Sequence, residues 1–329
     1  TCRTLRNELD ITDMYNIDDK YKKRLTQSII DRYVNLKKLD ASHNPEITSV
    51  NHLKKLEILN ATNCGINDAG LAHCINLKSL NAINNIKITS VNNLVNLEIL
   101  HSNGGINDAG IMKCINLKTL KMSRNYRITN VNHLMNLEEL DASQDCGIKD
   151  DGIRQCINLK ILNASRNAGI TTVNHLLNLE ILDASMHSGI GDAGMLQCVN
   201  LKELNAAGTY KITNVNHLVK LKLLNADYCG INDAGIVNCV NLESLDASDN
   251  SKITNVNHLT NLKILNASGV YCGINDAGIA RCVNLKLLKY NNNPNITHYP
   301  CINYSGINNG KIKRSINPKS LTTKSKQRI

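Results

Sequence analysis

The sequence contains no Trp and no Phe among its 329 residues, and it has only 4 Pro. Large aromatic side chains usually dominate the core of a compact domain, so Leu, Ile, Val and Ala must supply the buried surface. This composition favours many small, similar cores over one large core. The chain also lacks an apolar run of the ~18 residues that a membrane helix needs, and no signal-like stretch follows Thr1. We therefore expect a soluble protein that does not enter a membrane.

The sequence also lacks the motifs that mark common enzyme sites. It has no G-x-x-x-x-G-K-[ST] phosphate loop, no H-E-x-x-H zinc motif and no dinucleotide-binding glycines after a strand. No Ser or Cys is paired with a His around a special turn. We predict that the protein is not an enzyme and uses no cofactor or metal.

A repeat of 20 to 23 residues runs through most of the chain. Each of thirteen units begins with Leu, at positions 36, 56, 77, 97, 117, 137, 159, 179, 201, 221, 242, 262 and 285. Two unit types alternate, LKKLDASHNPEITSVNHLKK from Leu36 and LEILNATNCGINDAGLAHCIN from Leu56. Such a period is typical of a solenoid, in which each unit buries its apolar face against its neighbours.

The heptad CGINDAG occurs three times, at residues 64–70, 229–235 and 272–278. In the longer segment INDAGLAHC, Asp68 is placed to cap the free N–H groups of a short helix, with Leu71 and Cys74 inward at helical spacing. The same Asp recurs as Asp108, Asp192, Asp233 and Asp276. We therefore interpret the heptad as part of a structural unit and not as a copied catalytic loop.

The patterns L-x-x-L-x-A-x-x-N and L-x-x-L-x-A-x-x-C resemble the leucine-rich repeat signature, with Ala in its third apolar position. The Cys-type units are similar to those of F-box proteins, and the ITSVNHL units to the short protein-phosphatase-regulator repeats. The overall sequence resembles leucine-rich repeat proteins of amoeba-infecting giant viruses. The resemblance covers roughly residues 25–299. It implies an α/β solenoid with a curved parallel β-sheet on the inner face and short helices or 3-10 turns on the outer face.

The residues themselves indicate one short strand in each unit. In the segment LKKLDA, side chains alternate between the two faces, so Leu39 and Ala41 point to the core while Lys38 and Asp40 point outward. Thirteen such strands would lie side by side in a parallel sheet.

The N-terminal segment is expected to cap the first repeat. Residues 25–36 align with the second half of a unit whose strand is absent, which places Ile30, Tyr33 and Val34 over the open core. We therefore divide the chain into an N-terminal segment and capping half-repeat (1–34), an array of about 13 units (35–299) and a C-terminal tail (300–329).

Most of the net charge of +10 lies in that tail. Residues 311–328 contain seven basic residues and no acid, which leaves +10 − 7, about +3, for the rest of the chain. The tail lacks apolar periodicity, so we expect disorder. Its KIKR sequence is compatible with nuclear localisation or a nucleic-acid contact, but a solvated tail is favoured because no aromatic residues are interleaved. We expect nucleic acid to bind through this tail or not at all.

The cysteines form two columns that occur only in alternate units. One is at a turn (Cys64, Cys146, Cys229 and Cys272) and the other is in the core (Cys74, Cys114, Cys156, Cys198, Cys239 and Cys282). Neighbouring strands lie ~4.8 Å apart, so residues two units apart are nearly ~10 Å apart. That separation is too large for a disulfide or a shared zinc ion. We predict buried, reduced thiols, which favour the cytoplasm, of a host cell if the protein is viral, or the nucleus.

Histidine forms another column in the V-N-H-L segments, as His52, His133, His175, His217 and His258. The same spacing prevents these residues from sharing a metal ion. We predict solvated side chains on the outer return of each repeat.

The outward positions of the strands are where a solenoid usually recognises a partner. Four residues after each unit-start Leu, most side chains are Asn or Asp, and two residues after it, seven of thirteen are apolar. We expect the apolar ones to be exposed, as in a protein-binding surface; alternatively, they are strand-forming residues kept by duplication. The predicted binding residues are Ile99, His101, Lys121, Glu139, Asp141, Ile161, Asn163, Ile181, Asp183, Glu203, Leu223 and Asn225. We place Lys121, Glu139, Asp141 and Asp183 at the centre.

These patterns predict a monomeric, non-enzymatic module that binds a protein on its concave face. The F-box resemblance implies a narrower hypothesis, a substrate-recognition arm of a ubiquitin ligase that binds ligase subunits through a box preceding Thr1. The alternative is a structural or virion scaffold protein without a specific ligand. Tyr228 and Tyr271, in the longer loops, are further candidates at one rim.

Overall fold

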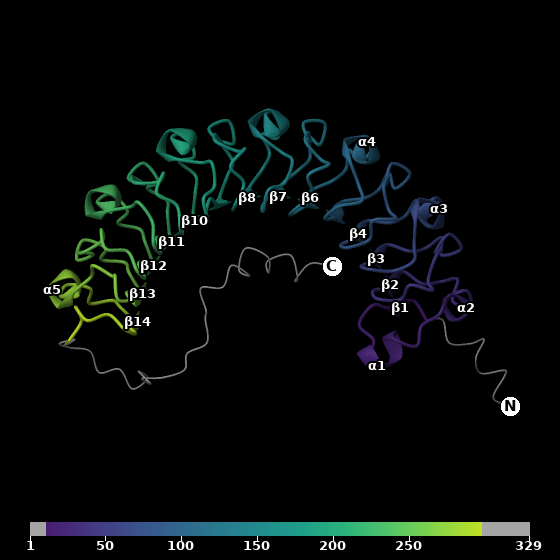
Figure 1. The fold of residues 1–329 in the computed structure, drawn as a ribbon, viewed down its shortest axis with the longest axis horizontal. Helices are drawn as coiled ribbons and strands as arrows, with labels where there is room; N and C mark the ends of the chain where they lie inside the picture. The colour runs from purple at the N-terminus through teal and green to yellow at the C-terminus, as the bar shows by residue number, and fades with distance from the viewer. Residues whose placement is uncertain (1–10, 298–329) are drawn as a thin grey trace. The chain divides into compact units, whose positions relative to one another are not determined.

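The computed structural model describes residues 11–297 and divides the chain into two compact units, residues 1–159 and 160–329. Each unit is a parallel β-solenoid, with its strands along one side and its short helices along the opposite side (Figure 1). The predicted tail and residues 1–10 lie outside the described residues. The division into cap, array and tail therefore stays a prediction.

Within residues 11–159, the first unit contains seven strands, each paired in parallel with the next along the chain. They are β1 Asp13–Met14, β2 Lys38–Asp40, β3 Ile58–Asn60, β4 Ser79–Asn81, β5 Ile99–His101, β6 Thr119–Lys121 and β7 Glu139–Asp141. The helices are α1 Asp19–Lys22, α2 Gln27–Ile30, α3 Asp68–Leu71, α4 Asp108–Ile111 and the 3-10 helix η2 Asp150–Ile153.

The described part of the second unit, residues 160–297, also contains seven strands that pair in parallel in chain order. They are β8 Ile161–Asn163, β9 Ile181–Asp183, β10 Glu203–Asn205, β11 Leu223–Asn225, β12 Ser244–Asp246, β13 Ile264–Asn266 and β14 Leu287–Lys289. The helices are η3 Asp192–Met195, η4 Asp233–Ile236 and α5 Asp276–Ile279. The thirteen predicted strands, β2 to β14, are confirmed at the expected positions.

The core of each unit consists of aliphatic side chains and thiols stacked from repeat to repeat. The Leu at the centre of every strand from β2 to β14 is buried. Both cysteine columns are also buried, as predicted, and the ten cysteines are free thiols. The Cys74 thiol donates to the Val50 carbonyl at 3.4 Å, and burial raises its pKa to about 11. The six thiols of the core column therefore act as small apolar residues that also satisfy a backbone carbonyl.

The second glycine of the repeated heptad lies against the preceding repeat. A Cβ on Gly70 would lie 2.2 Å from the Thr48 carbonyl oxygen, and one on Gly235 would lie 2.1 Å from that of Thr213. The Gly70 carbonyl in turn accepts from the Val50 amide at 3.0 Å. The heptad is repeated because the repeats must approach this closely, which agrees with its structural interpretation.

The prediction that Asp68 caps its helix is wrong. Asn67 is the N-cap, and its side chain accepts from the Gly70 amide at 2.9 Å. Asp68 instead accepts from the Thr89 amide at 2.7 Å and from the Thr89 hydroxyl, and so joins two repeats. The other members of the column bond to the next repeat in the same way, in the pairs Asp108–Thr129, Asp192–Thr213, Asp233–Thr254 and Asp276–Thr297.

The N-terminal cap differs from its prediction in two respects. It has a strand, because β1 pairs with β2 and buries Met14 next to Leu39 in register. Ile30 is buried as expected, but Tyr33 is only half-buried and Val34 is 57% exposed. Residues before the aligned half-repeat therefore help to cover the end of the core.

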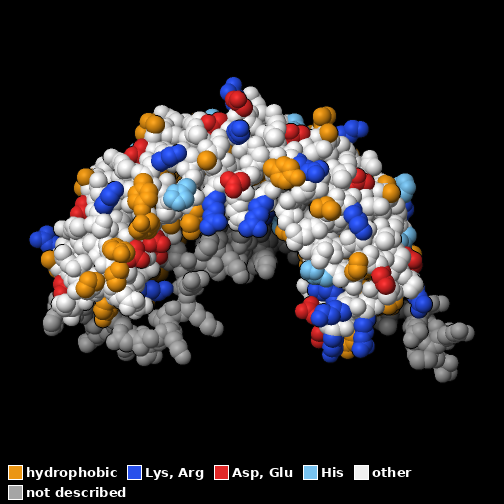
Figure 2. Space-filling view, in the orientation of Figure 1, with side chains coloured by type: hydrophobic (Ala, Val, Ile, Leu, Met, Phe, Trp, Pro, Cys, Tyr) orange, Lys and Arg blue, Asp and Glu red, His pale blue; other side chains and the backbone are white. Residues whose placement is uncertain are grey.

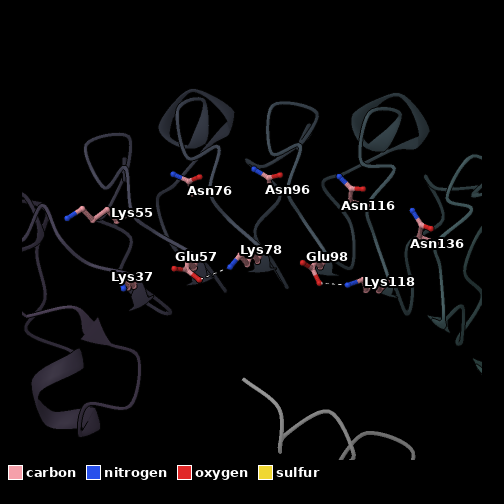
Figure 3. Close-up of a pocket in the computed structure, with 10 residues that line it drawn as sticks. All are labelled: Lys37, Lys55, Glu57, Asn76, Lys78, Asn96, Glu98, Asn116, Lys118 and Asn136. Atoms are coloured by element: carbon pink, nitrogen blue, oxygen red, sulfur yellow. Dashed lines mark hydrogen bonds and ion pairs between the residues drawn. The ribbon is translucent and has the colours of Figure 1, made fainter.

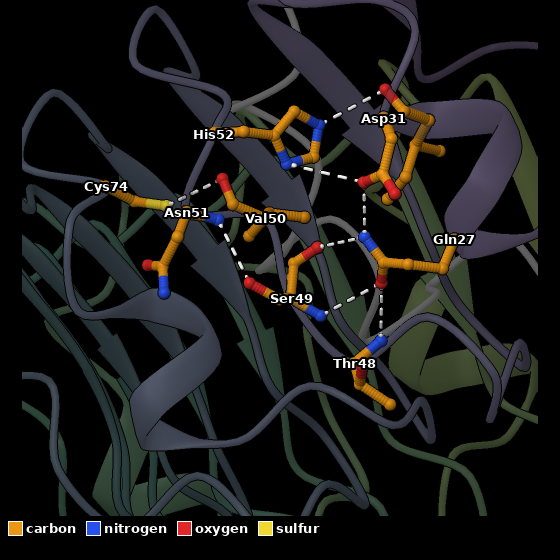
Figure 4. Close-up of polar contacts among 9 residues, drawn as sticks. Gln27, Asp31, Thr48, Ser49, Val50, Asn51, His52 and Cys74 are labelled. Atoms are coloured by element: carbon orange, nitrogen blue, oxygen red, sulfur yellow. Dashed lines mark hydrogen bonds and ion pairs between the residues drawn. The ribbon is translucent and has the colours of Figure 1, made fainter.

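Gln27 of α2 takes the place that Asp occupies in later repeats. Its Oε1 accepts from the amides of Thr48 and Ser49 at 2.9 and 3.1 Å, and its Nε2 donates to the Ser49 carbonyl at 2.8 Å (Figure 4). The cap is thus joined to the first full repeat through amides equivalent to those that Asp68 binds two repeats later.

The histidine column is not fully solvated, contrary to the prediction. His52 is half-buried, and its Nε2–H donates to the Ile30 carbonyl at 3.2 Å (Figure 4). The same bond to the end of the preceding helix is formed by His133, His217 and His258. These residues connect consecutive repeats on the outer side.

Candidate functional site

In the first unit, the strand face brings together five of the predicted residues. Ile99 and His101 lie on β5, Lys121 on β6, and Glu139 and Asp141 on β7, with His101, Lys121 and Asp141 in register. Lys121 Nζ lies 2.8 Å from Glu139 Oε1, and both side chains are mostly buried. Of the three predicted central charges in this unit, Lys121 and Glu139 are therefore paired with each other.

His101 is the one histidine of the strand face. It replaces the Asn or Asp of its column, beside Lys121 in the sheet. Burial, and to a smaller extent the positive charge of Lys121, lower its pKa to about 4. His101 is therefore neutral at pH 7, and the strand face carries an uncharged ring at this position.

In the second unit, seven predicted residues follow consecutive strands. Ile161, Ile181, Glu203 and Leu223 are in register across β8 to β11. The second row consists of Asn163, Asp183, Asn205 and Asn225, of which Asn205 had not been selected. Glu203 lies between two aliphatic side chains and forms no ion pair with any residue of 11–297. A carboxylate in that setting suits a cationic group of a partner.

The expectation that the apolar strand residues are exposed is wrong. Ile99, Ile161, Ile181 and Leu223 are half-buried, and only Ile264, at 36%, counts as exposed among the apolar residues of this row. The reason is the spacing of adjacent strands, which lets in-register side chains cover one another. The surface offers part of each aliphatic side chain.

The Asn and Asp column already has a role in the fold. Asp183 Oδ1 accepts from the Ser185 amide at 3.0 Å and from its hydroxyl at 2.6 Å, and Oδ2 accepts from Asn205 Nδ2 at 3.1 Å. Asp141 accepts from the Ser143 amide at 3.1 Å. Ten members of the column bond to an amide two residues later, at Asp40, Asn60, Asn81, Asp141, Asn163, Asp183, Asn205, Asn225, Asp246 and Asn266. Such Asx turns end these ten strands.

The rim of the second unit has exposed aromatic side chains at the predicted Tyr228 and Tyr271, which are 55% and 67% exposed. Tyr228 packs edge-on against Tyr210, with ring centroids 5.7 Å apart, although its φ of 44° is unfavourable for a bulky residue. Hydrophobic side chains gather over the part of the molecule that Figure 1 labels β10 to β13 (Figure 2). Nearby, burial and the charges of Asp246 and Asp249 raise the pKa of Asp227 to about 6.

The structure shows a surface that the sequence analysis did not select. Two residues before the unit-start Leu, eleven of the thirteen units have an aliphatic side chain or Met, and all eleven are exposed. The signal was present as a third apolar column, but buried and exposed columns look alike in a repeat sequence. We call these eleven residues the flank row: Val34, Ile75, Val95, Ile115, Met135, Ile157, Leu177, Val199, Val219, Val240 and Val283.

Within residues 11–297, no three His, Cys, Asp or Glu side chains lie where they could share a metal ion. In the same range, no helix is long and apolar enough to cross a membrane.

The chain shares its fold with solved leucine-rich repeat structures. An internalin, InlF of Listeria monocytogenes, matches with a TM-score of 0.62 and 21% identity over 82% of this chain and 84% of that one. The functional domain of InlJ from the same organism, which includes a cysteine ladder, matches at 0.59 and 18% over 80% and 65%. A leucine-rich repeat protein of Leptospira interrogans matches at 0.50 and 17% over 90% and 93%. No protein-family model and no curated protein matches the sequence.

Proposed function

We propose that the chain is a non-enzymatic module that binds a protein partner through its strand face. The main support is the row Ile161, Ile181, Glu203 and Leu223, in which half-buried aliphatic side chains surround a carboxylate without an ion pair in the described chain. Stacked repeats commonly present such extended faces to proteins. The binding residues are the twelve that the sequence analysis selected, and each unit contributes its own set.

The narrower proposal is a substrate-recognition arm of a ubiquitin ligase, acting in the cytoplasm or nucleus as a monomer. Its support is the resemblance of the Cys-type units to those of F-box proteins, together with ten buried free thiols, which suit a reducing compartment. The resemblance to giant-virus proteins would place it in a host cell. The competing proposal is a structural or virion scaffold protein without a specific ligand.

The test is affinity purification with mass spectrometry from the natural cell, followed by direct binding measurements with each purified candidate. The strand-face variant is Ile181→Glu with Leu223→Glu, because this row already accepts Glu at position 203. The matched control is Val237→Glu, which adds a charge at a 51% exposed position after η4. Circular dichroism checks that each variant folds.

A partner that binds the wild type and the control but not the strand-face variant supports the proposal. Ligase subunits among the recovered proteins support the narrower form. Equal recovery by all three chains, or recovery of nothing, rules out the strand face and favours the scaffold.

A further inference from the structure

In each of the two compact units, exposed aliphatic side chains form a row beside the sheet, on the side where the strands begin. In the first unit the flank row contains Val34, Ile75, Val95, Ile115, Met135 and Ile157, and in the second Leu177, Val199, Val219, Val240 and Val283. Their exposed fractions lie between 45% and 75%. The other two of the thirteen repeats have Lys54 and Thr260 at this position. The uninterrupted stretches run from Ile75 to Ile157 in the first compact unit and from Leu177 to Val240 in the second, and exposed apolar stretches of this kind mark a site of interaction.

The backbone of the flank row is held in place by asparagines. Asn96 Nδ2 donates to the Ile75 carbonyl at 2.9 Å, and Asn116 Nδ2 to that of Val95 at 2.9 Å. In the second unit, Asn241 Nδ2 donates to the Val219 carbonyl at 2.8 Å. The row is thus ordered before any partner arrives, which lowers the entropic cost of binding.

A groove follows the asparagines in the first unit and has a volume of about 530 Å³ (Figure 3). Its charged side chains are Lys37, Lys55, Lys78 and Lys118 against Glu57 and Glu98, which gives 4 − 2, a net charge of +2. The two carboxylates are paired, because Glu57 lies 3.0 Å from Lys78 and Glu98 lies 2.8 Å from Lys118. The excess positive charge therefore belongs to Lys37 and Lys55.

The second unit has a corresponding groove of about 450 Å³. It contains Lys202, Lys220, Lys222 and Lys263 against Glu243, and Glu180, outside the lining, lies 2.8 Å from Lys202, which leaves 4 − 2, a net charge of +2. Glu243 lies 3.4 Å from Lys222 and 2.7 Å from Lys263, so one carboxylate serves two ammonium groups. Each unit thus combines an exposed aliphatic row with a groove of net positive charge.

At the position directly before the unit-start Leu, two repeats have Lys where the others have Asn. Eleven of the thirteen unit-start leucines follow Asn, and the other two follow Lys55 and Lys220, one in each unit and each in a groove. Lys55 Nζ donates to Asn35 Oδ1 at 2.8 Å, and Lys220 Nζ donates to Asn200 Oδ1 at 2.6 Å. The fold accepts Asn at this position elsewhere, so the added cations are not needed for folding.

We propose that this flank is a second binding surface, separate from the strand face, that takes an extended acidic segment of a partner protein. Its carboxylates would bind the groove lysines, and its aliphatic side chains would cover the flank row. The flank row has no aromatic residue on which nucleic-acid bases could stack, which favours a polypeptide over a nucleic acid. The proposal does not depend on the strand face binding anything.

The test measures fluorescence anisotropy of a labelled peptide of alternating Glu and Val, long enough to span a groove, with the full 329-residue chain. Lys55→Asn with Lys220→Asn restores the column residue in both units. Ile115→Thr with Val219→Thr introduces the residue that Thr260 already provides in this row. The control pair, Lys113→Asn with Lys252→Asn, removes two exposed lysines that do not line these grooves.

We expect each of the first two variants to weaken binding of the Glu-Val peptide by about tenfold, the control to leave it unchanged, and added salt to weaken it. A Glu-Ser peptide should bind less tightly than Glu-Val, since it lacks aliphatic side chains. Equal binding by all variants overturns the proposal. Single-stranded DNA that binds as tightly as the peptide would indicate a polyanion site instead. Self-association lost in the Thr variant would identify a second copy as the occupant.

Discussion

The strand face and the flank row are both outward surfaces of the same repeats, but the fold uses them differently. On the strand face, Asp183 is 4% exposed and bonded through both oxygens, and the aliphatic side chains are half-buried. On the flank row, Val219 is 50% exposed, and it is the backbone carbonyl that the fold uses. A column that the fold does not need leaves more of each side chain for a partner.

The largest effect should come from the framework that both surfaces share. Gly235→Ala places a Cβ about 2.1 Å from the Thr213 carbonyl oxygen, so the repeats must separate. We expect a loss of about 4 kcal/mol in the free energy of unfolding, measured by urea denaturation with circular dichroism. Gly104→Ala is the control, because its Cβ would have nothing within 4 Å. Similar stabilities for the two variants would contradict this account.

On the strand face, Asp183→Ala should cost about 3 kcal/mol, because the Ser185 amide and Asn205 Nδ2 lose their buried acceptor. Asn225→Ala, in the same column and unit, removes a half-buried acceptor of the Asp227 amide and should cost about 1 kcal/mol. Urea denaturation measures both. If Asp183→Ala proved as stable as the wild type, the column would be free for recognition after all.

The regular part of the fold was predictable from the sequence. All thirteen strands follow from the unit-start Leu and from side chains that alternate between core and surface. The strand β1 could not be found this way, because Asp13–Met14 carries no repeat pattern and is defined by its pairing with Lys38 and Leu39. A cap needs to match only one edge of the array.

The partners of polar side chains were harder to predict than their positions. Asn67 and Asp68 are both suited to capping a helix, and the choice depends on Thr89 in the next repeat, which takes up Asp68. The strand-face column looked like a recognition stripe because the sequence pattern alone did not show that these side chains accept from amides two residues later. A contact with the next repeat decided the first case, and a local Asx turn decided the second.

The pH dependence of the free energy of unfolding tests whether the His101 ring is buried in the fold or solvated at the surface. Its pKa is about 4 in the folded state against about 6.5 when unfolded, so the unfolded chain binds the extra proton. Its contribution is complete above pH 6.5 and is lost as the pH falls toward 4. We expect wild type to lose about 3 kcal/mol more than His101→Asn over this interval. Parallel pH profiles of stability would show that the ring is solvated.

Ser102 offers a smaller effect in the opposite direction. Its hydroxyl, at the end of β5, is the buried side-chain oxygen that has no hydrogen-bond partner within residues 11–297. Most other repeats have Ala at this position, as Ala61 and Ala82 do. Ser102→Ala should therefore stabilise the protein by about 1 kcal/mol in urea denaturation. A loss of stability would mean that the hydroxyl has a partner in solution, such as an ordered water.

The smallest effect should be on the flank row itself. Val219→Thr keeps the β-branched shape and changes an exposed side chain, so the free energy of unfolding should change by less than about 0.5 kcal/mol. Ile181→Thr on the strand face, which is half-buried between in-register neighbours, should cost about 1 kcal/mol. Equal costs would remove the distinction between the two surfaces. If Val219→Thr leaves the free energy of unfolding unchanged while Ile181→Thr lowers it, folding does not require the eleven exposed aliphatic side chains of the flank row. Duplication of the repeat would then have preserved them without a need in the fold.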